Sequence, residues 1–214
     1  MSKTHNHLMQ PVLQPASPDM ASFTVPLIYL TMNEMADYLF GSDNAQNAQK
    51  LIKNLFQAKS NRFSYQFTEI VTVAEKPVGL VIAYSGKLMK SLKLPMALHL
   101  IRLRGILGFL NFIQRSFSMI GIKEAESDEY FISNIVVLPD YQGKGLGKYL
   151  LAQVEKQAIA QGLDKISLTV DVDNERAFSL YKQTGYKVIE VVEIESLRKR
   201  LGYTGFYRMQ KILS

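Results

Sequence analysis

The residues with the clearest chemical signature form a glycine-rich stretch between a predicted buried strand and a predicted helix. Gly143, Gly145 and Gly147 alternate with larger residues there, and Lys144 and Lys148 add positive charge. Glycine lets the backbone come close to a ligand, and the first amide N–H groups of a helix have no partner inside the helix. Such a helix start attracts phosphate through its free amides and its dipole. The stretch therefore predicts a site for a phosphate-bearing ligand.

Two other phosphate-binding motifs fail to match this stretch. A dinucleotide-binding Gly-x-Gly-x-x-Gly that starts at Gly143 needs glycine at position 148, where the chain has Lys148. A nucleotide-binding P-loop that ends at Gly147-Lys148 needs glycine at position 142 and serine or threonine at position 149. The chain has Gln142 and Tyr149 at these positions. Neither class of nucleotide-binding protein is therefore favoured.

A second informative stretch runs from Asn174 to Tyr186 and reads Asn-Glu-Arg-Ala-Phe-Ser-Leu-Tyr-Lys-Gln-Thr-Gly-Tyr. It resembles the Asn-x-x-Ala-x-x-Leu-Tyr-x-x-x-Gly-Phe signature of the GNAT superfamily of acyl-CoA N-acyltransferases, with tyrosine in place of the final phenylalanine. The Gln-x-x-Gly-x-Gly pattern of Gln142, Gly145 and Gly147 resembles the acyl-CoA loop of the same superfamily, as does the preceding Val-x-Pro-x-Tyr-Gln run. The clear resemblance covers residues 130–189, and the earlier elements agree with the family only in their order.

The resemblance implies acetyl-CoA, or another acyl-CoA, as co-substrate, and no metal. In this family the strand before the loop diverges from its neighbour, commonly at a bulge, and its free backbone groups pair with the pantetheine arm. Asn174 would reach the same arm, or would only cap its helix. The strand residues that match are Ile135, Val136 and Val137, whose side chains could also be ordinary sheet core. The loop residues whose backbone amides would hold the pyrophosphate are Gln142, Gly143, Lys144, Gly145, Leu146, Gly147 and Lys148.

The resemblance also implies the reaction, which is direct attack of a neutral amine on the thioester. Such a reaction needs both reactants oriented, the amine deprotonated, and a proton donor for the departing thiolate. Tyr181 matches the usual acid of the family, although it could instead be a packing residue on a helix face. Glu129, at the start of the strand, is the first candidate for the base. Ser133 could act through an ordered water, and a chain of waters could serve instead.

The chemistry requires strands and helices that alternate along the chain. Strand-like patterns occur at residues 23–30, 64–74, 78–84, 130–138, 165–172, 186–194 and 205–212. Four stretches are predicted to be helical. One ends near Phe40, one starts at about Asn44, one follows the glycine-rich loop and ends near Gln161, and one ends at Thr184. Hairpin and crossover connections together predict an α+β fold with a mixed sheet and helices on its faces. The GNAT resemblance implies that the sheet is mostly antiparallel, with six to seven strands. We expect one domain at residues 21–214 after a loose or irregular leader, residues 1–20.

Residues 87–123 depart from the family pattern, because a turn usually connects the third and fourth strands. This insertion is apolar, has no Asp or Glu and carries seven basic residues. Helices are plausible on both sides of Pro95. One hypothesis is a lid over the acceptor pocket, in which Arg102 and Arg104 read an acidic group of the acceptor. A membrane-surface helix, a dimer contact and a plain extra helical layer are the alternatives.

Composition excludes several classes of function. The chain has no cysteine, so disulfides, thiolate metal sites and a cysteine nucleophile are absent. Its three histidines are His5 and His7, near the N-terminus, and His99, in the basic insertion, so a histidine metal site is not expected. The sequence shows neither a signal peptide nor a run of about 18 uncharged apolar residues, and we expect a cytoplasmic protein without a membrane span.

The net charge of +6 is compatible with an anionic partner. A nucleic-acid-binding protein is disfavoured, because the basic residues alternate with Leu and Ile instead of exposed aromatic residues. The main competing hypothesis is a non-catalytic acyl-CoA sensor of the same fold. The sequence leaves open whether the acceptor is a small-molecule amine or an amine of a peptide or protein.

Overall fold

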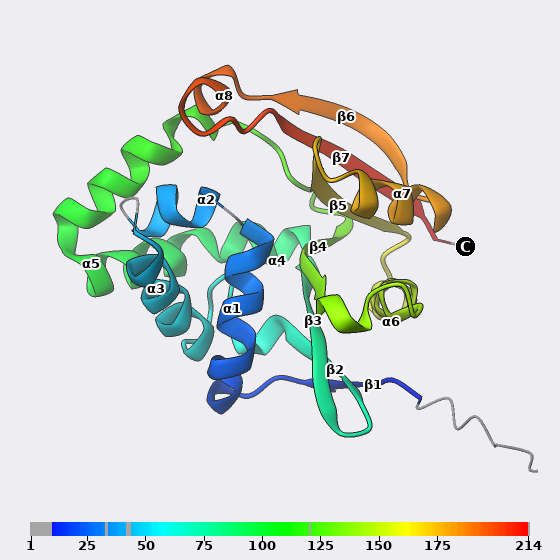
Figure 1. Ribbon diagram of the computed structural model, residues 1–214. Helices are drawn as coiled ribbons and strands as arrows, with labels where there is room; N and C mark the ends of the chain where they lie inside the picture. The colour runs from blue at the N-terminus through cyan, green and yellow to red at the C-terminus, as the bar shows by residue number, and fades with distance from the viewer. Residues whose placement is uncertain (1–9, 33, 42–43, 120, 214) are drawn as a thin grey trace, which may run out of the picture.

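Seven strands form one sheet in the computed structural model, and helices lie on both faces of the sheet (Figure 1). The structure describes residues 10–32, 34–41, 44–119 and 121–213. The strands are β1 (Val12–Pro15), β2 (Thr68–Val73), β3 (Lys76–Ser85), β4 (Glu129–Val137), β5 (Lys165–Asp171), β6 (Lys187–Glu193) and β7 (Gly205–Ile212). The helices are α1 (Ala21–Met32), α2 (Glu34–Ala36), α3 (Ala45–Gln57), α4 (Gly86–Ser91), α5 (Lys93–Ser116), α6 (Leu146–Ala160), α7 (Glu175–Gln183) and α8 (Glu195–Leu201).

The sheet is mixed and mostly antiparallel, as expected. Its strand order is β1-β2-β3-β4-β5-β7-β6, and β4 and β5 form a parallel pair, whereas the other described pairs are antiparallel. The β2–β3 hairpin turns at Ala74 and Glu75, which both have positive φ. Two such residues match the right-handed twist of the flanking strands.

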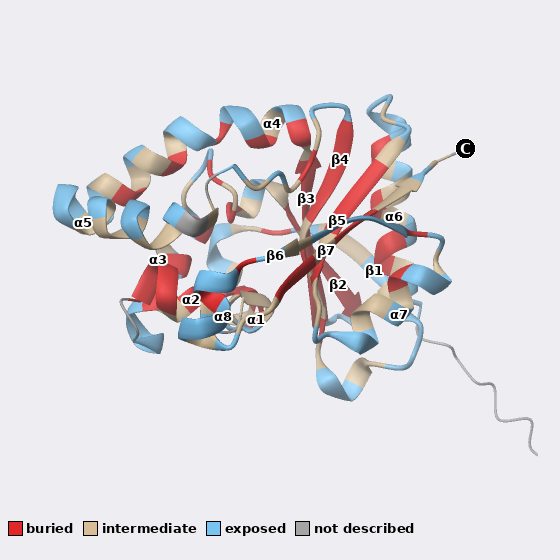
Figure 2. Cartoon of the chain, turned by 90° about the horizontal axis from the view of Figure 1, so that it is seen from above, coloured by how far each residue is buried: buried red, intermediate tan, exposed pale blue. Residues whose placement is uncertain are grey.

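Each face of the sheet has its own hydrophobic core. One core joins the sheet to α1, α3, α4 and α5, with Ile28, Phe56 and Leu100 among its buried residues. The other core joins the sheet to α6 and α7, through residues such as Leu150 and Tyr181. Figure 2 shows buried residues concentrated along the central strands, whereas α5 extends away from the sheet and is largely exposed. The two faces therefore have different coverings.

The first predicted strand is wrong, because residues 23–30 belong to α1. The run is apolar and rich in β-branched residues, which does not distinguish a strand from a buried helix. Ala21, Thr24, Val25 and Ile28 are buried at steps of one, three and four residues, which is helical spacing. The expected leader also differs from the structure, because β1 pairs with β2 along Val12–Pro15. The rest of that leader, residues 1–9, lies outside the described part of the chain.

The insertion between β3 and β4 is helical, as predicted. Pro95 lies in the first turn of α5, where the missing amide hydrogen costs no intrahelical bond. Gly105 has φ 71° and ψ 175°, so the helix bends there. Within the described residues, α5 is long and apolar enough to be a candidate membrane span by length and composition, although little of it is buried. Arginines interrupt its apolar stretch, which is why the sequence has no long uncharged run at this position. The short helix α8, between β6 and β7, was not predicted.

Candidate active site

Strands β4 and β5 run together for only part of their length. Their parallel pairing extends from Glu129 to Ile132 on β4. Beyond this point β4 pairs with β3 alone, and β5 pairs with β7. The divergence coincides with a bulge, because Ile82 pairs with Asn134 and Ala83 with Ile132, which leaves Ser133 without an opposite residue. We call the paired part the closed end and the diverging part the open end.

The open end leaves one backbone edge of β4 unpaired with β5. Ile135, Val136 and Val137 pair with β3 on their other side. Strand backbone that faces a gap offers N–H and C=O groups to an extended ligand. This geometry fits the predicted role of these three residues toward a pantetheine arm.

The glycine-rich loop follows β4 and leads into α6. Gly143 and Gly145 have φ 75° and 84°, which side-chain-bearing residues rarely adopt. Gly145 is the N-cap of α6 and supplies no side-chain cap, so the amides of the first turn have no partner within the helix. The side-chain Nε2 of Gln142 donates to the Val137 carbonyl oxygen at 2.8 Å and ties the loop to the end of β4. A Cβ on Gly147 would lie 2.9 Å from Leu180, so this glycine permits close contact with α7.

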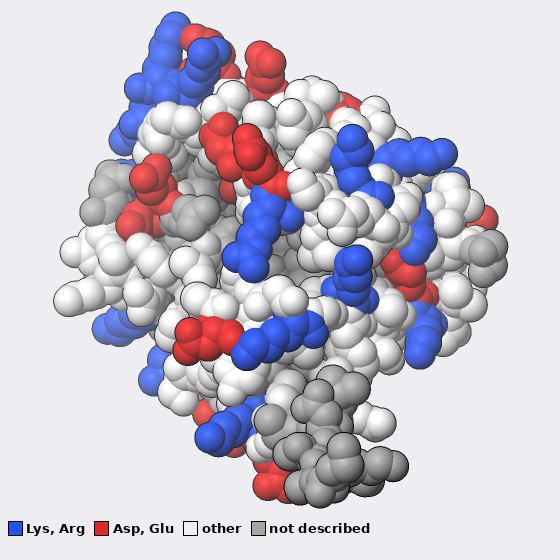
Figure 3. Space-filling view, turned by 45° about the vertical axis from the view of Figure 1, so that its right-hand side comes forward, with Lys and Arg blue, Asp and Glu red and all other residues white. Residues whose placement is uncertain are grey.

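The glycine-rich loop is exposed and carries two lysines. Gly143, Lys144, Gly145 and Lys148 are exposed, and the Lys144 ammonium lies 5.1 Å from the centre of the Tyr141 ring. On the face that Figure 3 shows, basic side chains are interspersed with acidic and uncharged ones instead of forming a continuous basic surface. This distribution suits a local anion site better than a nucleic acid backbone.

Helix α7 positions the other two cofactor-side candidates. The Asn174 side chain accepts a hydrogen bond from the Ala177 amide at 3.1 Å, so it caps the helix. Tyr181 is only 5% exposed, and its ring lies 6.0 Å from that of Tyr186. Burial raises the pKa of the Tyr181 phenol, and the charge of Asp171 raises it further. The phenol therefore stays protonated at neutral pH, as an acid requires.

Glu129, the first candidate for the base, is instead part of a buried ion pair at the closed end. It is fully buried, and its carboxylate accepts from the Arg208 guanidinium at 2.6 and 2.8 Å and from the Ser167 hydroxyl at 2.7 Å. Burial alone would raise the pKa of Glu129. Hydrogen bonds from the Glu126 amide, Ser167 and Arg208 outweigh burial and lower this pKa. A carboxylate with all these partners and a lowered pKa offers no free oxygen to a substrate, which argues against the prediction of Glu129 as base.

Ser133, the other candidate, lines a cavity of about 530 Å³ that also has Thr169 and Asp171 of β5 in its lining. Regular alternation would place Ser133 and Asn134 on opposite faces of the sheet, but the bulge lets both line this cavity. The Ser133 hydroxyl donates to Asn134 Oδ1 at 2.9 Å, and Asn134 Nδ2 donates to the Thr31 hydroxyl at 2.7 Å. Much of the remaining lining is apolar and comes from the insertion and the N-terminal helices, including Met32, Met35, Met89, Met96, Leu100, Phe109 and Phe112.

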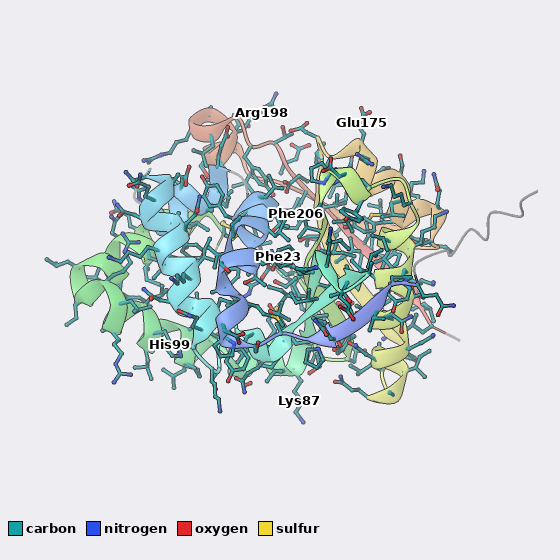
Figure 4. The ribbon with its side chains drawn as sticks, turned by 60° about the horizontal axis from the view of Figure 1, so that its bottom comes forward. Phe23, Lys87, His99, Glu175, Arg198 and Phe206 are labelled. Carbon is teal, nitrogen blue, oxygen red and sulfur yellow. The ribbon has the colours of Figure 1, made fainter. Side chains whose placement is uncertain are left out.

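Asp171, which the sequence analysis did not single out, also lines this cavity. It is the last residue of β5 and pairs with Phe206 of β7. The Phe206 side chain lies in the interior of the molecule (Figure 4). Asp171 Oδ1 accepts from the Tyr203 hydroxyl at 2.8 Å. Burial raises the pKa of Asp171, and the hydrogen bond from Tyr203 only partly offsets this effect. The sequence did carry a signal for Asp171 as a functional residue, because it is an acidic residue at the end of a parallel strand, just before the second signature.

Arg102 and Arg104 do not line the cavity, so the structure does not support their predicted contact with the acceptor. Arg102 is exposed, and α5 turns Met96, Leu100 and Phe109 toward the cavity instead. The insertion residues that line the cavity are therefore mostly apolar, and Lys90, Lys93 and Lys123 are the basic ones among them. No group of three or more His, Asp or Glu residues that could hold a metal occurs in the described part of the chain.

Comparison with known proteins agrees with this geometry. The sequence model of the acetyltransferase (GNAT) family matches residues 75–186. The chain belongs to this family. It is 40% identical over 65 residues to an acetyltransferase of Sodalis glossinidius, a match that covers 30% of this chain and 44% of the relative. The chain spans less than half of the length of the curated relatives it matches.

Two solved structures show the same fold across nearly the whole chain. An N-acetyltransferase from Staphylococcus aureus Mu50 is similar with a TM-score of 0.65 and 21% identity, covering 93% of this chain and 98% of that one. The PaiA N-acetyltransferase of Thermoplasma acidophilum, solved in complex with coenzyme A, is similar with a TM-score of 0.53 and 11% identity. That likeness covers 95% of this chain and 99% of the Thermoplasma chain.

Proposed function

We propose that this protein is an N-acyltransferase that transfers an acetyl or other acyl group from coenzyme A to a primary amine by direct attack in a ternary complex. The observation that carries the proposal is the divergence of β4 from β5 at Ser133, next to the uncapped start of α6. Family membership and a relative of the same fold that was solved with coenzyme A support it.

The residues at the open end fit acyl-CoA. The free backbone edge at Ile135–Val137 would pair with the pantetheine arm, and the amides from Gln142 to Lys148 would hold the pyrophosphate. Bound acyl-CoA supplies the thioester that carries the acyl group. Tyr181 holds a proton for the sulfur, because burial keeps its phenol neutral. Amine and thioester would meet where the cavity reaches the divergence, which gains rate through orientation.

Calorimetric titration with acetyl-CoA and free CoA tests this proposal, using a Gly145→Glu variant. Gly145 and Gly162 both have positive φ, and a Cβ at either position would meet no atom within 4 Å, but Gly162 lies at the far end of α6. Gly162→Glu therefore carries the same backbone strain and the same added charge away from the loop. We expect Gly145→Glu to weaken binding roughly tenfold or more, through a repelled phosphate and lost amide contacts, and Gly162→Glu to bind like wild type. A folded wild type that binds neither ligand contradicts the proposal.

Thiol release with a panel of amines then separates an enzyme from the alternative, an acyl-CoA sensor of the same fold. Binding without release for any amine favours the sensor. Acyl-CoAs of increasing chain length in the same assay define the transferred group.

A further inference from the structure

We propose that the cavity binds a primary amine with an apolar body and that Asp171 holds the amino group and accepts its proton. This inference rests on the proposed acyl transfer and names its acceptor class and a further catalytic residue. The observations that carry it are the position of Asp171, its hydrogen bonding and the side chains around it.

Asp171 has no cationic partner among the described residues. Among the described residues, the hydrogen bond to its carboxylate comes from the neutral Tyr203 hydroxyl. Four described cations line the cavity. Arg62 pairs with Glu124 at 2.8 Å, Lys123 pairs with Glu126, and Lys90 donates to the Ser127 hydroxyl. No described contact joins Lys90 or Lys93 to Asp171. Asp171 is partly buried, and a partly desolvated carboxylate without a counterion is complementary to a cation brought by a ligand. An ammonium group meets that need through a charge-assisted hydrogen bond.

The rest of the cavity selects the body of the acceptor. Methionine, leucine and phenylalanine side chains form much of its lining, and the volume of about 530 Å³ suits a small organic molecule. Methionine side chains adapt to irregular apolar shapes. A polyamine or a free amino acid would bring a second charge into this lining, where it would lose its hydration. An alkyl or aryl primary amine brings a single charge, which Asp171 binds.

Asp171 also lies close enough to the predicted acid for its charge to act on Tyr181. In the reaction, Asp171 takes a proton from the ammonium, and the nitrogen lone pair forms the C–N bond as the C–S bond breaks. The sulfur leaves with a proton from Tyr181. The acceptor ammonium gives up two protons in total, and the sulfur keeps one of them, so one proton is released to water. Proton exchange with water returns Asp171 to its charged form and Tyr181 to its protonated form.

An Asp171→Asn variant tests this role, because it keeps the shape and the acceptor oxygen for Tyr203 but removes the charge. Asp173→Asn is the matched control, since Asp173 is an exposed neighbour that does not line the cavity. The assays are thiol release with hexylamine, phenethylamine, spermidine and glycine, and calorimetry with acetyl-CoA. We expect kcat/KM for hexylamine or phenethylamine to fall roughly 10²-fold or more in Asp171→Asn. Acetyl-CoA affinity should be unchanged in both variants, and activity should be unchanged in Asp173→Asn.

A second variant tests the cavity itself. Ala97 lines it from α5, and Ala97→Phe should raise KM for phenethylamine but not for ethylamine. Preference for spermidine or glycine, or full activity of Asp171→Asn, overturns the inference and leaves acyl transfer standing. Loss of acetyl-CoA binding by wild type would instead remove the proposed function and this inference together.

A different observation supports a second proposal, which concerns the surface of α5. Beyond the bend at Gly105, Ile106, Leu110, Ile113 and the C-cap residue Phe117 recur at helical spacing and are 67%, 55%, 40% and 73% exposed. Leu107, beside them, is 82% exposed. Ile113 also belongs to the cavity lining. We call these five residues the outer face of α5. So many exposed apolar side chains on one helix indicate a binding surface rather than scattered surface residues.

We propose that the outer face of α5 rests on an anionic lipid bilayer. The insertion carries basic residues and no acidic ones, and Arg102, three residues before the bend of α5, is exposed. Apolar residues with neighbouring cations match the acyl boundary and the headgroups of such a bilayer. A second copy would bring cations against cations. Buried Met96 and Leu100, and the bond from Arg115 to the Tyr38 carbonyl at 2.7 Å, hold α5 along the protein, which favours lying on a bilayer over crossing it.

Co-sedimentation with vesicles tests this second proposal. We expect binding to vesicles of phosphatidylcholine mixed with phosphatidylglycerol, weaker binding to phosphatidylcholine alone, and weakening by salt. The double variant Leu107→Asn, Leu110→Asn should bind at least tenfold more weakly and keep its acetyl-CoA affinity. Absence of binding to the anionic vesicles overturns the proposal, as does a lipid-free dimer that the double variant dissociates.

Discussion

The two ends of the β4–β5 pair each place a carboxylate on a strand, fully buried for Glu129 and partly buried for Asp171, but their surroundings differ. At the closed end, Glu129 is surrounded by donors from the turn before β4, from β5 and from β7, and its pKa is lowered. At the open end, Asp171 receives one hydrogen bond, faces a cavity and has a raised pKa. The difference teaches that donors from neighbouring strands convert a carboxylate into a structural anchor. Where the strands diverge, the same chemical group is left for a ligand.

The largest effect should come from breaking the closed end. Glu129→Gln leaves Arg208 buried without its charge partner, so the free energy of unfolding should fall by about 3–5 kcal/mol. Urea denaturation measures this change. Asp128→Asn, which breaks a neighbouring exposed pair with Lys165, is the control and should cost far less. If Glu129→Gln keeps wild-type stability but loses acyl transfer, Glu129 acts in the reaction and is not a structural anchor.

The next effect concerns the acid at the open end. Tyr181→Phe removes the proton held for the sulfur, and kcat should fall by roughly 10²-fold, equivalent to about 2.7 kcal/mol. Steady-state kinetics with calorimetry separates this loss from acetyl-CoA binding, which should persist. Tyr186→Phe is the matched control, because its ring lies 6.0 Å away on the same side of the sheet. Equal losses in both variants would indicate a packing role for Tyr181.

The pH profile sharpens the contrast between the two carboxylates. The raised pKa of Asp171 means that it is protonated at acidic pH and gains its charge as pH rises through that pKa. Below that pKa, the slope of log kcat/KM against pH should be larger by one in wild type than in Asp171→Asn. The lowered pKa of Glu129 acts on stability instead. Its contribution is present above the unfolded pKa and is lost as pH falls through the folded pKa.

Four titratable groups around Asp171 bear on this profile, besides the cations of the cavity lining, Arg62, Lys90, Lys93 and Lys123. They are Asp173 in the same loop, Tyr181 on α7, Tyr203 after α8, and Glu124, whose charge acts on Tyr203. An Asp171→Asn profile with the wild-type slope would show that another of these groups controls the reaction.

The smallest effect concerns Asn174, which caps α7 at the open end. Asn174→Ala should lower the free energy of unfolding by about 1 kcal/mol. Asn44→Ala is the control, since Asn44 caps α3 in the same way, accepting from the Asn47 amide at 3.0 Å. If Asn174 also reaches the cofactor, only Asn174→Ala weakens acetyl-CoA binding. Identical behaviour of the two variants restricts Asn174 to capping.

Much of the fold could be predicted where local patterns decide the structure. The β2–β3 hairpin, the caps at Asn44 and Asn174, and β7 all follow from short-range spacing and turn chemistry. The strand predicted at residues 23–30 was wrong because an apolar, β-branched run satisfies a buried helix and a buried strand equally well. Which one forms depends on the core that α1 shares with α3, and that contact is not local.

The amino-acid sequence by itself determined the cofactor side of this protein. A strand, a glycine-rich loop and a helix start are contiguous, and backbone amides bind phosphate without help from distant residues. Only the tertiary structure decided the acceptor side. It gave Glu129 a partner at Arg208, left Asp171 facing a cavity, and brought α1, α5 and β4 together around that cavity. The role of a carboxylate depends on the charges and donors around it, and the chain supplies those from positions far apart in sequence.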